Sequence, residues 1–188
     1  MTEPVRCAWS EKTENMRQYH DTEWGIPVHD DRKHFEFIIL DGFQAGLSWQ
    51  TIINKRPAFK KAFAAFDPKK VAKFTDEELE EQMHNEGIIR NRLKVFGARK
   101  NAVAFLEVQK EFGSFDKYIW QFTSGKTIDG KRKAISAIPA STPESDAMSK
   151  ALKKRGFTFV GATICYAYMQ AAGMVNDHVK ECWRKEAV

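Results

Sequence analysis

One stretch near the C-terminal end of the sequence limits the possible folds more than any other. Residues 157–175 contain no Asp, Glu, Lys or Arg. An uncharged run of this length raises the possibility of a membrane span. However, Gly161, Gln170 and Gly173 interrupt the run, and the sequence has no second one. We therefore interpret it as a buried helix of a globular core and predict no membrane association.

Helix start signals recur along the rest of the chain. Side chains suited to N-caps precede apolar patterns of helical period, and proline follows two of them; these caps are Asp30, Ser48, Asp67, Thr75, Ser114 and Thr142. No sustained alternating pattern and no internal repeat is present, so the sequence predicts an all-α fold. Residues 1–29 and 123–140 are expected to be irregular, the second as a mobile loop. Pro57 is expected to kink or break a helix.

Size, charge and cysteine content bound the class of protein. The 188 residues are enough for a single domain with a sizeable core. A net charge of +5 suits a polyanionic partner without identifying one. Three cysteines are too few for a disulfide framework, and the first ten residues have no apolar signal segment, so we expect a cytoplasmic protein.

Residues 40–49, with the sequence LDGFQAGLSW, join two of the predicted helices. They place a carboxylate (Asp41) and a large ring (Trp49) at the junction, while Gly42 and Gly46 loosen the backbone between them. Such a junction suits the wall of a pocket for a flat, electron-poor ring. The alternative is a corner of the core, with Trp49 buried and Asp41 a solvated acid at a helix end. Spacing alone slightly favours this alternative.

The C-terminal quarter predicts two helices joined by a short turn between Gly156 and Gly161. Backbone amides that precede a second helix, together with its dipole, can bind one phosphate of a DNA strand. The basic residues beside the turn favour this hypothesis over a plain helical hairpin; they are Lys150, Lys153, Lys154 and Arg155.

Two residues close to the C-terminal end suggest a metal site. We expect this segment to be helical, which places His178 and Cys182 on one face of the helix, where they can share a metal. Cys7 and His20 can supply two further ligands, which gives the closed Cys₂His₂ set of a structural zinc that joins both ends of the chain. A His-x-x-x-Cys pair alone is usually accidental, and Cys165 fits better as a small core residue.

Several segments carry a resemblance to a known family: residues 6–9 (RCAW), 19–25 (YHDTEWG), 44–49 (QAGLSW), 88–92 (IIRNR), 149–157 (SKALKKRGF), 159–161 (FVG), 169–171 (MQA) and 175–178 (VNDH). The sequence closely resembles the bacterial DNA-3-methyladenine glycosylase I family of the helix-hairpin-helix superfamily, over almost the whole chain. The resemblance implies one glycosylase domain over residues 1–188, with the helix-hairpin-helix at about 143–173. It also implies that the segments 1–29 and 175–188 are joined by one structural zinc, bound by Cys7, His20, His178 and Cys182.

The resemblance further implies a monofunctional DNA glycosylase. Such an enzyme flips 3-methyladenine out of alkylated double-stranded DNA, hydrolyses its N-glycosidic bond and releases the free base, which initiates base excision repair. We expect it to act as a monomer. Two alternatives are a non-catalytic, zinc-stabilised DNA-binding module and a zinc hydrolase. Four protein ligands would leave a hydrolase no open position on the metal.

The roles of individual residues follow from the same resemblance. The base pocket contains Tyr19 and Trp49, with Trp9 and Trp24 as neighbours. Asp41 is the pocket acid at a position where the family has glutamate, and Met16 stands where relatives place a second ring. Gly46 and Leu47 form a wedge that fills the gap left by the flipped nucleotide, and further DNA contacts are assigned to Phe159, Gly161 and Lys154. Asp177 lies where many superfamily members have a catalytic aspartate, but we assign it an orienting role beside a zinc ligand.

Overall fold

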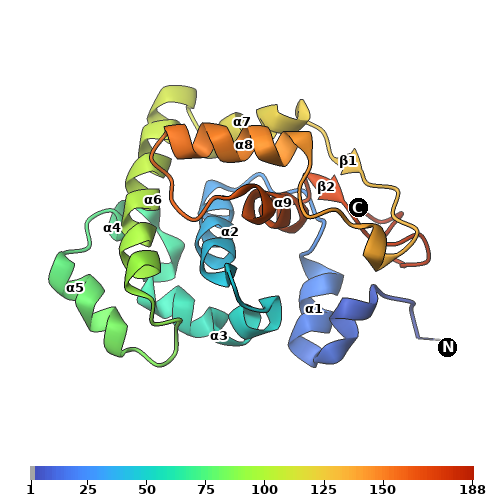
Figure 1. Ribbon diagram of the computed structural model, residues 1–188, viewed down its shortest axis with the longest axis horizontal. Coiled ribbons are helices and arrows are strands. Elements are labelled where there is room, and N and C mark those ends of the chain that lie inside the picture. Colours follow the sequence, from blue (N-terminus) through green and yellow to red (C-terminus); the bar gives the residue numbers. More distant parts are fainter. Residues whose placement is uncertain (1–2) are drawn as a thin grey trace.

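The computed structural model describes residues 3–188 and is mostly helical, as the sequence predicts (Figure 1). The longer helices are α1 (Glu14–Thr22), α2 (Asp31–Gln44), α3 (Trp49–Ala62), α6 (Arg92–Phe112), α8 (Pro143–Lys154) and α9 (Ala162–Ala171). The shorter ones are α4 (Pro68–Val71), α5 (Asp76–Glu81) and α7 (Phe115–Ile119), and single 3₁₀ turns lie at Ala8–Lys12, Ala64–Phe66, Gln82–His84, Trp120–Thr123 and Ile135–Ala137. Two short strands, β1 (Ile128–Asp129) and β2 (Val175–Asn176), pair in parallel and were not predicted.

The predicted N-caps are confirmed. Asp30, Ser48, Asp67 and Ser114 each accept a hydrogen bond from a backbone amide of the first helical turn that follows. Thr75 and Thr142 form full capping boxes. The expectation of an irregular segment 1–29 is wrong for residues 8–22, because a 3₁₀ turn is followed there by α1, which Thr13 caps and which buries Met16, Tyr19 and His20 on one face. Residues 1 and 2 of the segment lie outside the described residues. Of the two outcomes expected at Pro57, a break does not occur, since α3 continues to Ala62, and the kink stays a prediction.

Helices α2 and α9 form the centre of the molecule and contact each other (Figure 1). Helix α2 also contacts α3 and α6, and α9 packs against α8. The uncharged run therefore forms a buried core helix, in which Cys165, Tyr166 and Met169 are at most 3% exposed. No helix in the described residues is long and apolar enough to cross a membrane.

The two end segments meet on one side of the molecule (Figure 1), where the Trp183 amide donates to the Val5 carbonyl. The prediction that His178–Cys182 is helical is wrong. Gly173 turns the chain at φ +67°, at a place where a Cβ would lie 2.3 Å from the backbone of Ile26. The chain then pairs as β2 and continues in turns, one of them closed by a hydrogen bond from the Cys182 amide to the Val179 carbonyl.

Candidate active site and metal centre

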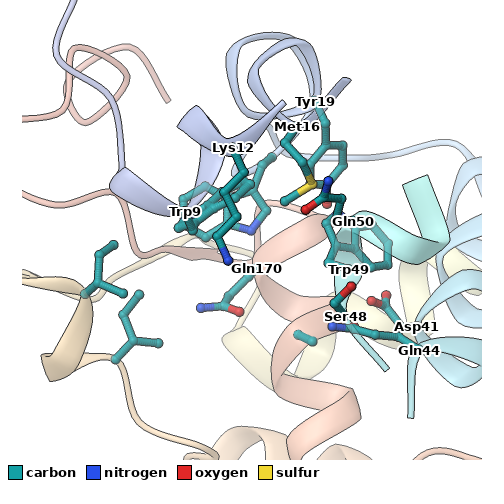
Figure 2. Close-up of a pocket in the computed structure, with 14 residues that line it drawn as sticks. Trp9, Lys12, Met16, Tyr19, Asp41, Gln44, Ser48, Trp49, Gln50 and Gln170 are labelled. Atoms are coloured by element: carbon teal, nitrogen blue, oxygen red, sulfur yellow. The ribbon is translucent and has the colours of Figure 1, made fainter. Parts of the chain in front are cut away.

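A pocket of about 470 Å³ lies between α1, the C-terminal end of α2, the start of α3 and α9 (Figure 2). Its walls come from segments far apart in the sequence: Trp9, Lys12, Met16, Tyr19, Trp24, Asp41, Gln44, Ser48, Trp49, Gln50, Ile135, Ile138, Ala167 and Gln170. All five residues assigned from sequence to the base pocket are therefore brought together at one cavity. Met16 also lines it and is buried.

Aromatic rings form much of the pocket wall. The rings of Tyr19 and Trp49 are tilted by 51° with centroids 5.3 Å apart. Trp9 approaches Tyr19 at 6.3 Å and packs edge-on against Trp24 at 5.0 Å. Figure 2 shows Trp9 across the pocket from Trp49 and Asp41. The cavity thus offers flat apolar surfaces to a planar ligand.

Asp41 projects from the last turn of α2 and is only 2% exposed. Within the described residues its Oδ2 atom has no hydrogen-bond partner, and the same holds for Nε1 of Trp49. Burial raises the pKa of the Asp41 carboxyl well above its usual value. The alternative of a solvated acid is therefore wrong. A buried, unpaired carboxyl group at the edge of a pocket is instead typical of a ligand-binding position.

Several lining residues were missed by the sequence analysis. Gln170 is a polar residue of the uncharged helix α9, and that isolated polarity was the only signal of its place in the pocket. Gln44 lies within the junction segment, but nothing in the sequence distinguished it from a surface glutamine. Ile135 and Ile138 come from the segment 123–140, and their contribution depends on the way this loop crosses the pocket.

Asp177 lies outside the set of residues that line the pocket. It is fully buried and accepts hydrogen bonds from Arg132 Nε (2.7 Å), Gln170 Nε2 (2.8 Å) and the Tyr166 hydroxyl. Both oxygens of its carboxylate are therefore hydrogen-bonded within the protein. The bond from Arg132 also joins the segment 123–140 to the C-terminal end segment, while the mobility expected of that segment stays a prediction.

The four predicted metal ligands are gathered into one buried cluster, which we call the Cys₂His₂ cluster (Cys7, His20, His178 and Cys182). Their ligand atoms all lie within 4.8 Å of one another. Cys182 Sγ is 3.4 Å from His20 Nε2 and 3.4 Å from His178 Nδ1, and Cys7 Sγ is 3.8 Å from His178 Nδ1. A tetrahedral ion with bonds of about 2.0–2.3 Å separates its ligands by roughly 3.5 Å. The cluster therefore fits a bound metal ion.

The second nitrogen of each histidine in the cluster also has a partner. His20 Nδ1 lies 2.8 Å from Asp21 Oδ1, and Arg6 holds that carboxylate at 2.8 Å. His178 Nε2 lies 3.1 Å from the Trp24 carbonyl oxygen. Such outer contacts fix the ring orientation and leave the inner nitrogens free to bind a metal.

The residues assigned to DNA contacts lie in two turns. Gly46 (φ +81°) and Leu47 (41% exposed) belong to residues 45–48, which we call the wedge turn. Phe159 and Gly161 belong to residues 155–161, which we call the hairpin, and Lys154 is exposed just before it. The half-buried Phe159 has its ring packed against Gly97 of α6.

Comparison with known proteins agrees with this arrangement. A family model described as methyladenine glycosylase matches residues 9–185. A DNA-3-methyladenine glycosylase of Haemophilus influenzae is 46% identical over 178 residues, which cover 95% of this chain and 96% of that protein.

Solved structures show the same likeness. A crystal structure of a 3-methyladenine DNA glycosylase I superimposes with a TM-score of 0.93 at 46% identity, covering 95% of this chain and 98% of that one. A variant of a 3-methyladenine DNA glycosylase I, solved in complex with 3-methyladenine, gives a TM-score of 0.93 at 32% identity and covers 96% of this chain and 97% of that one. Family model, sequence and structure agree over nearly the whole chain, which therefore belongs to the methyladenine glycosylase family.

Proposed function

We propose that this protein excises 3-methyladenine from duplex DNA by hydrolysing its N-glycosidic bond, which releases the free base and leaves an abasic site. The observation that carries the proposal is the carboxyl group of Asp41, buried with one unpaired oxygen at the edge of a ring-lined pocket. The membership in the methyladenine glycosylase family and the relative solved with 3-methyladenine support the same substrate.

The pocket chemistry suits a methylated adenine better than a normal one. Methylation at N3 gives the nucleotide base a positive charge, and aromatic faces such as those of Tyr19 and Trp49 attract a cation by about 0.5–2 kcal/mol. The Asp41 carboxylate adds attraction and can accept a hydrogen bond from the exocyclic amine. Because burial alone raises the pKa of Asp41, a bound cation is expected to draw the group back toward its ionised form.

Hydrolysis then needs little help from the protein. The charged base is a good leaving group, so water can attack the anomeric carbon without a strong general acid. Normal adenine lacks the charge and leaves less readily. We assign no amine nucleophile, because a monofunctional glycosylase requires none. Asp177 accepts hydrogen bonds from three donors of the protein, and we assign it to holding the Arg132 and Gln170 side chains in place.

The base must leave the duplex before it can enter the pocket, at a cost of roughly a few kcal/mol. We assign Gly46 and Leu47 to the wedge that fills the vacated space. We assign the hairpin to one phosphate of the backbone. Within the described residues the amides of Phe159, Val160 and Gly161 have no acceptor in the protein, and they precede α9, whose dipole favours an anion there. Lys154 is the adjacent cation.

We assign zinc to the Cys₂His₂ cluster, in a structural role. Two thiols and two imidazoles form the donor set of closed tetrahedral zinc sites. Such an ion contributes folding energy and joins the two end segments, and we route no chemical step through it. We expect Cys7 and Cys182 to bind it as thiolates.

The test is to incubate the protein with methylated duplex DNA and to identify the released base by chromatography. We expect 3-methyladenine, with far less release by Asp41→Asn. Binding of DNA without release of any base would favour a non-catalytic DNA-binding module instead. Release of other methylated bases in preference to 3-methyladenine would contradict the proposed specificity.

A further inference from the structure

One face of α6 contacts both turns that the proposed function places against DNA. Lys94, Gly97 and Asn101 are three and four residues apart, so they share a face of the helix. Lys94 reaches the end of α2, where the wedge turn begins. Gly97 and Asn101 contact the hairpin. We call these three residues the bracket face.

Lys94 is a lysine with an unusual environment. It is only 7% exposed, and its ammonium group donates to the carbonyls of Phe43 (2.8 Å) and Ala45 (2.7 Å). Burial lowers the pKa of this ammonium group. The structure removes it from the surface and directs it into the protein.

The contact has a clear physical function at the end of α2. The last carbonyls of a helix have no partner within it, and a cation near them is favourable. Helix α2 has no basic residue in its own last turn. Lys94 supplies the cation from another helix and holds the carbonyls that lead directly into the wedge turn. The same turn of α2 carries Asp41.

The hairpin is held by the other end of the bracket face. Asn101 is 4% exposed; its Oδ1 accepts from the Thr158 amide (2.7 Å) and its Nδ2 donates to the Thr158 carbonyl (3.1 Å). Gly97 permits the close approach, because a Cβ there would lie 2.8 Å from Thr158 Oγ1 and 3.1 Å from the Phe159 ring. The Lys94 ammonium itself lies 5.9 Å from the centre of that ring.

We propose that Lys94 is a positioning residue for nucleotide flipping, which fixes the wedge turn relative to the hairpin through the bracket face of α6. The inference rests on the proposed function. If the hairpin holds one phosphate, the wedge must enter the stack at a set distance from it. A displacement of about 1 Å can reduce a rate by about a hundredfold. A rigid helix that hydrogen-bonds to both turns maintains this spacing.

The test compares Lys94→Met, which keeps most of the side-chain length but removes the donors, with Lys94→Arg and Lys100→Met. Lys100 is an exposed lysine of the same helix and controls for the loss of one charge. Four quantities are measured. The first three are the single-turnover rate of excision from methylated duplex, the affinity for free 3-methyladenine, and the salt-dependent affinity for unmodified duplex. The fourth is the fluorescence of 2-aminopurine placed opposite a stable abasic analogue, which reports wedge insertion without any bond cleavage.

We expect Lys94→Met to slow excision from duplex by about 10- to 100-fold and to reduce the 2-aminopurine signal. The affinities for free base and for unmodified duplex should stay close to those of the parent, Lys94→Arg should recover part of the loss, and Lys100→Met should behave as the parent. A parallel fall of all quantities would show a merely structural role and overturn the inference. Unchanged excision and fluorescence would overturn it too. If the parent released no base, the proposed function would fail, while the fluorescence comparison would still decide the role of Lys94.

Discussion

The Cys₂His₂ cluster and the pocket are both buried polar regions, yet they differ in how their polar atoms are satisfied. In the cluster, the outer nitrogen of each histidine has a protein partner, and the inner donor atoms converge on a single point. In the pocket, the Asp41 and Trp49 side chains each have one atom with no hydrogen-bond partner among residues 3–188. Trp24 contacts both regions, because its ring centroid lies 4.6 Å from that of His178 and the same residue lines the pocket.

This difference suits the cluster to holding an ion permanently and the pocket to binding and releasing a ligand. A ligand set whose remaining atoms are all bonded holds an ion with little freedom to rearrange. A buried polar atom without a hydrogen-bond partner costs free energy in the empty pocket. A ligand whose groups pair with such atoms removes that cost when it binds. We expect the cluster to govern stability and the pocket to govern affinity. The predictions below test that separation.

The largest effect, on stability, should follow from removal of one ligand of the Cys₂His₂ cluster. Cys182→Ala removes one of four metal ligands and leaves the other three buried without their ion. We expect a loss of more than about 3 kcal/mol of stability, which for a chain of this size lowers Tm by more than about 6 °C. Thermal unfolding with metal analysis checks it. Cys165→Ala, at a buried cysteine outside the cluster, is the control and should retain one zinc per chain. An equal Tm for Cys182→Ala and the parent would contradict a structural metal.

A smaller effect is expected in the pocket, and on affinity. Asp41→Asn keeps the shape of the side chain and removes its charge. Loss of a hydrogen bond to a charged group costs about 1.5–3 kcal/mol, or roughly 10- to 150-fold in the affinity for 3-methyladenine. Discrimination against adenine should fall with it. Asp41→Glu restores the charge on a longer side chain and should retain activity. Calorimetry with the free base checks all three proteins, and parent-like binding by Asp41→Asn would remove Asp41 from the site.

The same substitution should act in the opposite direction on stability. Because burial raises the pKa of Asp41 in the folded protein, the unfolded chain loses this proton at a lower pH than the folded one. The contribution of Asp41 to the free energy of unfolding therefore falls as the pH rises above about 3.8, the pKa of this group in the unfolded chain. We expect ligand-free Asp41→Asn to melt a few degrees above the parent at neutral pH and level with it in strong acid. A constant difference at every pH would mean that ionisation of Asp41 plays no part.

The smallest effect should come from a residue that belongs to neither region. Lys154→Glu reverses one exposed charge beside the hairpin. We expect affinity for any duplex to fall by a similar factor, with the salt dependence reduced by a slope of about one. Tm and base affinity should not change. Lys69→Glu, the same reversal on α4, is the control. Salt titrations of DNA binding that show no difference between the two variants would refute the contact at Lys154.

Local chemistry explains which features could be predicted from the sequence. An N-cap such as Ser48 acts on the amide of Thr51, three residues away, so a short window contains all the information. The metal ligands could be proposed because cysteine and histidine are rare and their chemistry is narrow. The helix assigned to His178–Cys182 was nevertheless wrong. The pairing of β2 with β1 depends on a strand more than forty residues earlier, which no local pattern reveals.

Other features depend on packing between distant segments. Asp41 was slightly favoured as a solvated acid, because a carboxylate at a helix end usually is one. Its burial comes from the packing of α9 against α2, which the junction segment does not encode. For the same reason, no local pattern distinguishes Lys94 from nearby basic residues such as Arg92 and Lys100. Only the position of the α2 carbonyls makes it a buried cap.

The meeting of the two end segments has a consequence for the order of events during synthesis. Cys7 contacts His178 across a separation of 171 residues. A ribosome adds about 5–20 residues per second, so the first two ligands of the cluster emerge on the order of ten seconds before the last two. During that interval the Cys7 thiol and the His20 imidazole have no complete site to enter. An ion bound by the cluster can complete its ligand set only after Cys182 has been synthesised, so a shortage of metal would act on the last step in the assembly of this site.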